Sequence, residues 1–362
     1  MEAFIECFSI IPDPRAMNAQ HDLMEILFIA LASHLCGGKT CTDMEDFGHA
    51  KKDVLQEILE LPYGIPSHDT FSNVLARLDP EALSKAFARF MAAFNKNVSQ
   101  EKIIAIDGKA LRRAFMKGKR TSPPMLVTAW GSELRMILNS REVIDGNESA
   151  AAIELLQLID VKGSIVTADA LHCTRPMAEA IISRGGDYVL ALKKNQIGLL
   201  SEAENLFSVT RDMPTASTEE KGHGRCEMRQ ATVIDAPQLA AKHDFKGLTA
   251  LGRIESMRTI EGITETATRF FVLSRSVKPT QLLHIVRAHW GVENCAHWAL
   301  DVVMDEDLAR NRKNHSAANL AFLRRLTLNI LRADTSKGSL RVKTKRAGWQ
   351  NAFLFKLLAH MR

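Results

Sequence analysis

The chain has 362 residues, of which 46% are hydrophobic and 25% are charged, and its formal net charge is +5 at pH 7. This composition is ordinary for a globular protein and excludes the disordered and fibrous classes. The length allows two domains, or one large core with an appended module. No apolar run reaches the roughly 18 residues of a membrane span, and the first residues lack the pattern of a signal peptide, so a cytoplasmic protein is expected.

The cysteines and the basic residues narrow the function classes further. Six cysteines occur at irregular spacings without a C-x-x-C pair, which argues against a zinc module and against a disulfide framework. Two basic clusters suit a polyanion, because neutralising phosphates releases counterions. Each cluster taken alone is equally consistent with a solvated loop. The clusters are Lys109, Arg112, Arg113, Lys117, Lys119 and Arg120, and Arg341, Lys343, Lys345 and Arg346.

The first 100 residues are predicted to form a helical N-terminal domain. Apolar residues recur at helical spacing over 23–31, Ser67 and Asp69 are capping residues for a short helix, and Pro80 begins another. Two short helices joined by a tight turn could read DNA as a helix-turn-helix. They could equally belong to an ordinary helical bundle.

Residues 101–362 are predicted to form a second domain that begins with alternating strands and helices. Strands are expected over 103–106, 125–130 and 134–138, followed by a helix over 148–159, a strand over 164–167, a helix over 176–182 and a strand over 188–192. This β-β-β-α-β-α-β order is that of an RNase H-like core, so an α/β fold class is expected. A β-rich insertion is predicted at about 200–278, with helices returning at 279 and over 316–331.

Three carboxylates are candidates for a metal site. Asp107 and Asp169 each directly follow a predicted apolar strand, where an open α/β fold places its functional crevice. Phosphodiester cleavage commonly uses two metal ions about 4 Å apart, and Mg²⁺ prefers carboxylate oxygens. Glu293 is the candidate for the third ligand, with His297 and Asp301 following at i+4 and i+8 on the same helix. A surface or capping role is the usual alternative for any one carboxylate, and Asp107-Gly108 could be a simple turn.

Several separated motifs resemble bacterial insertion-sequence DDE transposases that include the H-repeat-associated proteins. They are Gly64 to Phe71 (GIPSHDTF), Ile104 to Arg112 (IAIDGKALR), Ala168 to His172 (ADALH), Leu192 to Gln196 (LKKNQ) and His289 to Asn294 (HWGVEN). The resemblance covers nearly the whole chain. It implies an RNase H-like catalytic core with a β-rich insertion, a helical N-terminal domain, and Mg²⁺-dependent DNA cleavage followed by strand transfer. Two Mg²⁺ ions, which Mn²⁺ could replace, would be held by Asp107, Asp169 and Glu293.

Further residues are candidates for DNA contact. They are Lys109 and Arg112 near the metals, Lys193, Lys194 and Asn195 past a strand end, His223 and Arg225 in a turn, and His289 before Glu293. A surface residue without a role is the alternative for each. Related transposases carry a tyrosine, an arginine and a lysine around the glutamate, whereas Val286, His289 and Leu300 stand at that spacing here, so those three phosphate-handling roles do not transfer. His172 is expected to be structural, because Mg²⁺ sites favour oxygen.

The expected partners are double-stranded DNA, as the terminal inverted repeats of the element and as target DNA, and a second copy of the chain. Three alternatives remain open at this stage. The protein could be a domesticated transposase that cuts as a nuclease without joining, an inactive transposase that only binds DNA, or a metal-dependent hydrolase of small molecules. Dispersed basic clusters favour a long polyanion over a small substrate.

Overall fold

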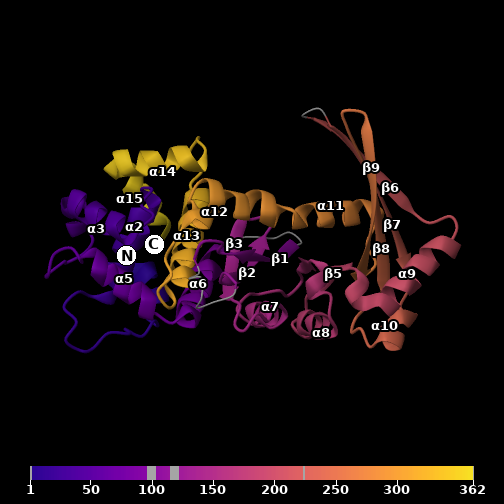
Figure 1. Cartoon of the computed structure of the whole chain (residues 1–362), viewed down its shortest axis with the longest axis horizontal. Coiled ribbons are helices and arrows are strands. Elements are labelled where there is room, and N and C mark those ends of the chain that lie inside the picture. The colour runs from indigo at the N-terminus through magenta and orange to yellow at the C-terminus, as the bar shows by residue number, and fades with distance from the viewer. Residues whose placement is uncertain (1, 96–102, 115–121, 223–224, 362) are drawn as a thin grey trace.

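The computed structural model describes residues 2–95, 103–114, 122–222 and 225–361. The molecule is elongated, with helices gathered at one end, a sheet through the middle and long strands at the other end (Figure 1). Both termini lie in the helical end. Among the described residues, none of the helices combines the length and apolar character needed to cross a bilayer.

The helical end unites the beginning and the end of the chain in one apolar core. Its buried residues come from 4–91 and from 292–358, together with a few from the first strands. Ser67, an expected capping residue, accepts a backbone N–H bond at the start of its helix, and Asp22 does the same at the start of an earlier helix. The helices are α1 (Glu2–Phe8), α2 (Leu23–Leu35), α3 (Cys41–Ala50), α4 (Lys52–Gln56), α5 (His68–Arg77), α6 (Pro80–Asn95), α13 (Ser316–Ala333), α14 (Leu340–Trp349) and α15 (Asn351–Leu358).

Helix α13 is the centre of this core. It is buried on nearly every side, and the Nδ2 atom of its Asn319 donates to the carbonyl oxygens of Leu75 and Leu78 at 2.8 and 2.9 Å. Phe87 of α6 meets Phe322 of α13 with ring centroids 6.4 Å apart. The predicted helices around Ser67 and Pro80 therefore pack their apolar faces into a helical bundle.

The expected β-β-β-α-β-α-β order is present between residues 103 and 192. Strand β1 is antiparallel to β2 and parallel to β4, and β4 is parallel to β5, which gives the order β3-β2-β1-β4-β5. The elements are β1 (Ile103–Ala110), β2 (Met125–Gly131), β3 (Met136–Glu142), α7 (Glu148–Gln157), β4 (Ile165–Ala168), η1 (Ala170–His172), α8 (Arg175–Ser183) and β5 (Asp187–Leu192).

The β-rich region extends the same sheet. Strand β9 pairs antiparallel with β5, so β9, β8, β7 and β6 continue the sheet to nine strands. The strands expected near 227–234, 247–259 and 265–273 are present, whereas β6 and two helices in this region were not predicted. The elements are η2 (Lys194–Gln196), α9 (Ile197–Val209), β6 (Thr215–Gly222), β7 (Arg225–Asp235), α10 (Gln238–His243), β8 (Ala250–Ile260) and β9 (Ile263–Leu273).

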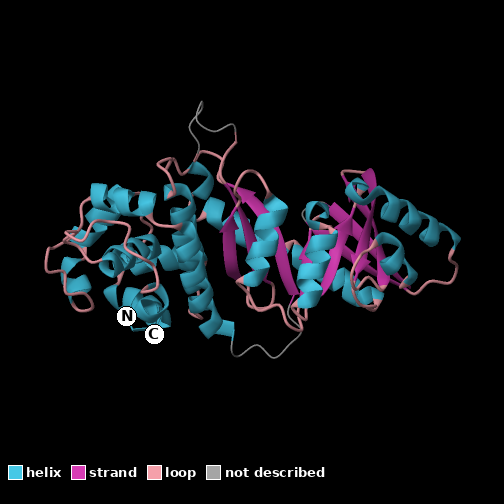
Figure 2. Cartoon of the chain, turned by 90° about the horizontal axis from the view of Figure 1, so that it is seen from below, coloured by secondary structure: helices cyan, strands magenta, loops and turns pink. Residues whose placement is uncertain are grey.

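Helices cover the two faces of the first five strands differently (Figures 1 and 2). Ile104 and Ile106 of β1 share a core with α7 and α8 on one face. The other face, to which Ala105, Asp107 and Lys109 belong by strand alternation, lies under one nearly continuous helical run. That run consists of α11 (Pro279–His289), the π-helical turn η3 (Val292–His297) and α12 (Trp298–Val302), and it leads into the 3₁₀ turn η4 (Glu306–Leu308).

A buried ion pair joins this run to the helical core. Arg325 Nη1 of α13 is 2.8 Å from Glu306 Oε1 of η4, and both side chains are fully buried. Nη1 also donates to the Ala321 carbonyl at 3.0 Å. Removing one member of such a pair leaves an uncompensated charge in an apolar interior.

We therefore expect Glu306→Ala to lower the free energy of unfolding by about 3–5 kcal/mol. Urea unfolding followed by circular dichroism measures this loss. The control is Glu81→Ala, which removes the exposed i,i+4 partner of Lys85 and should cost less than about 1 kcal/mol. Equal losses in the two variants would show that the buried pair does not stabilise the junction.

Candidate active site

The pairing of β1 with β4 brings two aspartates side by side. The parallel register ends at Ile106 opposite Ala168, so Asp107 and Asp169 are the next residues on neighbouring strands. Adjacent strands are about 4.8 Å apart. Asp107 was predicted to follow its strand, but β1 continues through Ala110 because β2 pairs with it along its whole length, and Asp107 lies opposite Thr128.

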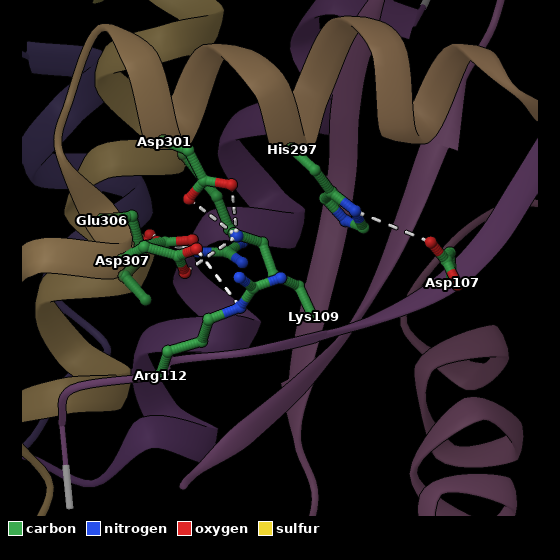
Figure 3. Close-up of polar contacts among 9 residues, drawn as sticks. Asp107, Lys109, Arg112, His297, Asp301, Glu306 and Asp307 are labelled. Carbon is green, nitrogen blue, oxygen red and sulfur yellow. Dashed lines mark hydrogen bonds and ion pairs between the residues drawn. The ribbon is translucent and has the colours of Figure 1, made fainter.

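The helical run above the sheet follows the direction of β1 (Figure 3). His297 Nδ1 is 3.6 Å from Asp107 Oδ2, and one helical turn later Asp301 is 2.7 Å from Lys109 Nζ. Four helical residues rise about 6 Å and two strand residues about 6.6 Å, so the two periods match at this spacing. The helix is thereby fixed over the strand at two successive contacts.

Glu293 lies on the π-helical turn at the start of this alignment. The Trp298 backbone N–H bonds to the Glu293 carbonyl five residues back, which widens the turn. A Cβ atom added to Gly291 would lie 3.0 Å from Trp130 Nε1, so this glycine allows the close approach of the turn to β2. The Glu293 side chain is exposed, and its charge acts together with burial to raise the pKa of Asp107, so this carboxylate lies within electrostatic range of Asp107.

The two aspartates have opposite electrostatic environments. Burial raises the pKa of Asp107 to about 6, and the neighbouring charges of Asp169 and Glu293 act in the same direction. His289 lowers the pKa of Asp169, and its Nε2 is 3.6 Å from Asp169 Oδ1. The other nitrogen of His289 is 3.0 Å from Thr167 Oγ1, which orients the ring.

His297 is neutral at physiological pH. Burial, reinforced by the positive charges of Arg325 and Lys109, lowers its pKa to about 3. Its Nε2 is buried without a hydrogen-bond partner among the described residues. The imidazole therefore contacts the Asp107 carboxylate without neutralising its charge.

Lys109 and Arg112, two predicted DNA contacts, differ in exposure. Lys109 is 7% exposed, and its Nζ lies between Asp301 and Asp307 at 2.7 and 3.3 Å. Arg112 has a 77% exposed side chain that reaches Asp307 at 3.4 Å. The exposed guanidinium is accessible to a phosphate, whereas the Lys109 ammonium is already held by carboxylates.

The residues after β5 border a hollow beside Asp169. Lys193 and Lys194 are exposed and line a cavity of about 510 Å³ together with Asp169, Arg269 and Trp290. Asn195 Nδ2 donates to the carbonyls of Ala170 and Cys173 at 2.6 and 3.3 Å. The lysines are thus free to meet a ligand, and the asparagine amide supports the loop that follows Asp169.

The predicted contacts in the β-rich region lie elsewhere. Arg225 is exposed at the first position of β7, at the tip of the hairpin with β6. His223 lies outside the residues that the structure describes. Within the described part of the chain, Arg225 makes no hydrogen bond or ion pair with the three candidate carboxylates.

Glu148 and His172 lie beside the site, although the sequence did not predict either as a metal ligand. His172 Nε2 is 3.2 Å from Glu148 Oε1. A Cβ atom added to Gly108 would lie 2.3 Å from that same oxygen, so Glu148 packs directly against the residue after Asp107. The pair therefore links the segment after Asp107 to the turn after Asp169. The sequence did not predict this contact, because Asp107-Gly108 could be a simple turn.

The donor chemistry of the site fits a divalent metal ion. Asp107, Asp169 and Glu293 offer hard oxygen ligands, and burial together with the charges of Asp169 and Glu293 raises the pKa of Asp107, an effect that a cation would relieve. Across the described parts of the chain, no three His, Cys, Asp or Glu side chains are close enough together to enclose an ion as they stand.

Comparison with known proteins decides the family. The model of the transposase DDE domain matches residues 99–330, and the model of the associated DDE_Tnp_1 region matches residues 5–91. The chain belongs to the DDE transposase family. This transposase is 32% identical over 372 residues to YhhI of Escherichia coli K12, provisionally named an H repeat-associated transposase, covering 99% of this chain and 98% of YhhI. It is also 37% identical over 279 residues to an uncharacterised protein of the dhlA 3′ region in Xanthobacter autotrophicus, covering 75% and 94% of the two chains.

The raised pKa of Asp107 predicts how the metal-free transposase responds to pH. Because the pKa of about 6 in the folded protein exceeds the ordinary aspartate value of 3.8, ionisation opposes folding, and stability falls as pH rises through this interval. Asp107→Asn should therefore increase the free energy of unfolding at pH 8 by roughly 1–3 kcal/mol. The gain should shrink as pH falls from 6 toward 4.

Urea unfolding in EDTA at pH 5 and pH 8 measures this difference. The matched control is Asp46→Asn, an exposed aspartate in the helical end, which should show no pH-dependent gain. A decrease in stability for Asp107→Asn at pH 8 would contradict the electrostatic description of the site.

Proposed function

We propose that this transposase cleaves DNA at the ends of an insertion sequence and joins the freed ends to target DNA, using a metal site formed by Asp107, Asp169 and Glu293. The observation that carries the proposal is the register of β1 and β4, which makes the two aspartates neighbours beneath the turn that bears Glu293. The strand order β3-β2-β1-β4-β5 supports assignment of this part to an RNase H-like core.

The metal assignment rests on the chemistry of the three carboxylates. Two Mg²⁺ ions, or Mn²⁺ in their place, would activate the attacking oxygen and stabilise the leaving oxygen. Asp107 on β1, Asp169 directly after β4 and Glu293 on η3 would hold these ions. His289 keeps Asp169 ionised and oriented, and His297 limits the movement of the Asp107 carboxylate.

The reaction sequence needs two exchanges of the same kind. In cleavage, a water oxygen bonds to phosphorus and the 3′ oxygen leaves as a 3′-hydroxyl. In joining, that 3′ oxygen bonds to a target phosphorus and the target's own 3′ oxygen leaves. Cleavage by water lowers the number of phosphodiester bonds by one, and joining leaves that number unchanged. No oxidant or nucleotide cofactor is therefore required.

Glu293 is favoured over Asp301 as the third ligand. Asp301 is already paired with Lys109 through both carboxylate oxygens, at 2.7 and 2.8 Å, and lies about two turns farther along the helical run. Glu293 is exposed, and its charge acts on Asp107. The roles differ accordingly, because Glu293 is available to a cation whereas Asp301 holds Lys109.

Double-stranded DNA is the proposed substrate, and a homodimer would bring two element ends together. Lys193 and Lys194 would contact phosphates beside Asp169, and Arg112 would do so beyond β1. Arg225 and His223 are proposed to contact DNA that extends over the β-rich region. His289 would act on the DNA indirectly, because it holds the Asp169 carboxylate in place.

The test is cleavage of a labelled duplex that carries the element end, with Mg²⁺ or Mn²⁺. Wild type should give a nick with a 3′-hydroxyl, and Asp107→Ala, Asp169→Ala and Glu293→Ala should each lower the rate by at least 10³-fold while binding persists. The matched control is Asp301→Asn, which removes the other acidic side chain considered as the third ligand on this helical run.

The outcomes separate the alternatives. Loss of cutting in Asp301→Asn with retention in Glu293→Ala would transfer the third ligand to Asp301. Cutting without joining would identify a nuclease derived from a transposase. Binding without cutting, with either metal ion, would reject the catalytic proposal in favour of an inactive DNA-binding protein.

A further inference from the structure

The segment that follows α12 is anchored by three consecutive acidic residues. Asp305 pairs with Lys39, Glu306 with the buried Arg325 at 2.8 Å, and Asp307 with Lys109 at 3.3 Å. These contacts fix the segment to the loop between α2 and α3, to α13 and to β1 at once, and Figure 3 shows the contact of Asp307 with Lys109. The following residues are therefore presented from a firmly held base.

The next residues are basic and exposed. Arg310, Arg312 and Lys313 all face solvent. Arg312 Nε donates to the Arg113 carbonyl at 3.1 Å, and Lys313 Nζ donates to Asn73 Oδ1 at 2.6 Å. The loop thus lies between the end of β1 and helix α5, two parts of the chain that are distant in sequence.

The contact with Arg113 creates a continuous basic surface. We call it the arginine surface, and it consists of Arg112, Arg113, Arg310, Arg312 and Lys313. Among the described residues, the carboxylate that pairs with this surface is Asp307, which Lys109 already shares. The five cations therefore leave a strong positive potential toward solvent.

The arginine surface lies a short way along β1 from the candidate metal site. Five residues separate Asp107 from Arg112, which corresponds to at most about 16 Å of extended chain. Base pairs are spaced about 3.4 Å apart along duplex DNA. Arg112 therefore lies no more than about five base pairs, measured along a duplex, from a phosphate held at Asp107.

An acidic hollow borders the same loop on its other side. His315, whose N–H bonds to the Ala76 carbonyl, lines a hollow together with Asp79, Glu81, Glu142 and Asp145. A phosphate backbone would be repelled there and attracted to the arginine surface. The electrostatic potential therefore changes from positive to negative where the arginine surface meets the acidic hollow.

We propose that the arginine surface binds the sugar–phosphate backbone of duplex DNA about five base pairs from the scissile phosphate. The inference rests on the proposed function, since it takes DNA as the substrate. Exposed guanidinium groups suit bidentate contact with phosphate oxygens. This surface holds the duplex in register and reads no base sequence.

The experiment measures affinity for an end-bearing duplex at several salt concentrations. In the variant Arg310→Ala/Arg312→Ala/Lys313→Ala, the slope of log Kobs against log salt should become shallower by about 2–3, because each lost phosphate contact contributes about 0.9. The single variant Arg310→Gln should change the slope by about 0.9, because Arg310 is exposed and makes no hydrogen bond or ion pair among the described residues. Thermal unfolding confirms that each variant is folded.

The matched control removes three exposed charges from the face that carries α7 to α10, as Lys162→Ala/Arg211→Ala/Lys242→Ala. Its slope should equal that of wild type. Equal slopes for wild type and both triple variants, or equal losses in both triple variants, would overturn the proposal.

Shortening the duplex tests the position. Truncating one arm to about three base pairs from the cleavage point should remove the difference between wild type and the Arg310/Arg312/Lys313 variant, and truncating the other arm should preserve it. A difference that survives both truncations overturns the assigned place. All these readings come from binding alone, so a wild type that binds but never cuts would reject the proposed catalysis while leaving the arginine surface tested.

Discussion

The alignment of one helical run with one strand is the constraint on which the site depends. His297 contacts Asp107 and Asp301 contacts Lys109, because one helical turn and two strand residues cover nearly the same distance. The widened turn η3 precedes these contacts and carries Glu293. A shift of the helix by one residue would rotate all three helix side chains away from β1 together.

Charge is distributed along β1 in a graded way. At Asp107 burial, reinforced by the charges of Asp169 and Glu293, raises the pKa of the carboxyl group to about 6, which suits a place that receives cations. At Lys109 positive and negative groups balance each other, with the ammonium 7% exposed. At Arg112 the surface becomes basic and open. The strand therefore passes from a cation-binding environment to an anion-binding one within six residues.

The two ends of the chain cooperate to hold this arrangement. Helix α13 lies in the core built by the N-terminal helices, and its Arg325 holds Glu306 next to the residue that pairs with Lys109. The β-rich region acts at the opposite side, where β9 pairs with β5 and extends the sheet. Helix α11 crosses from this extension to β1. The helical core and the β-rich region therefore both support the same helical run.

The sequence by itself determined the strand and helix order, the helix caps and the family, because these depend on local periodicity and on motifs of neighbouring residues. It predicted strands after residue 200 but not their union with the central sheet, since pairing partners are set by long-range contacts. It predicted DNA contact for both Lys109 and Arg112. In the structure Lys109 is buried between Asp301 and Asp307, whereas Arg112 is exposed. Only the tertiary structure brought Glu148 to Gly108 and Arg312 to Arg113, because neither contact leaves a pattern in the chain.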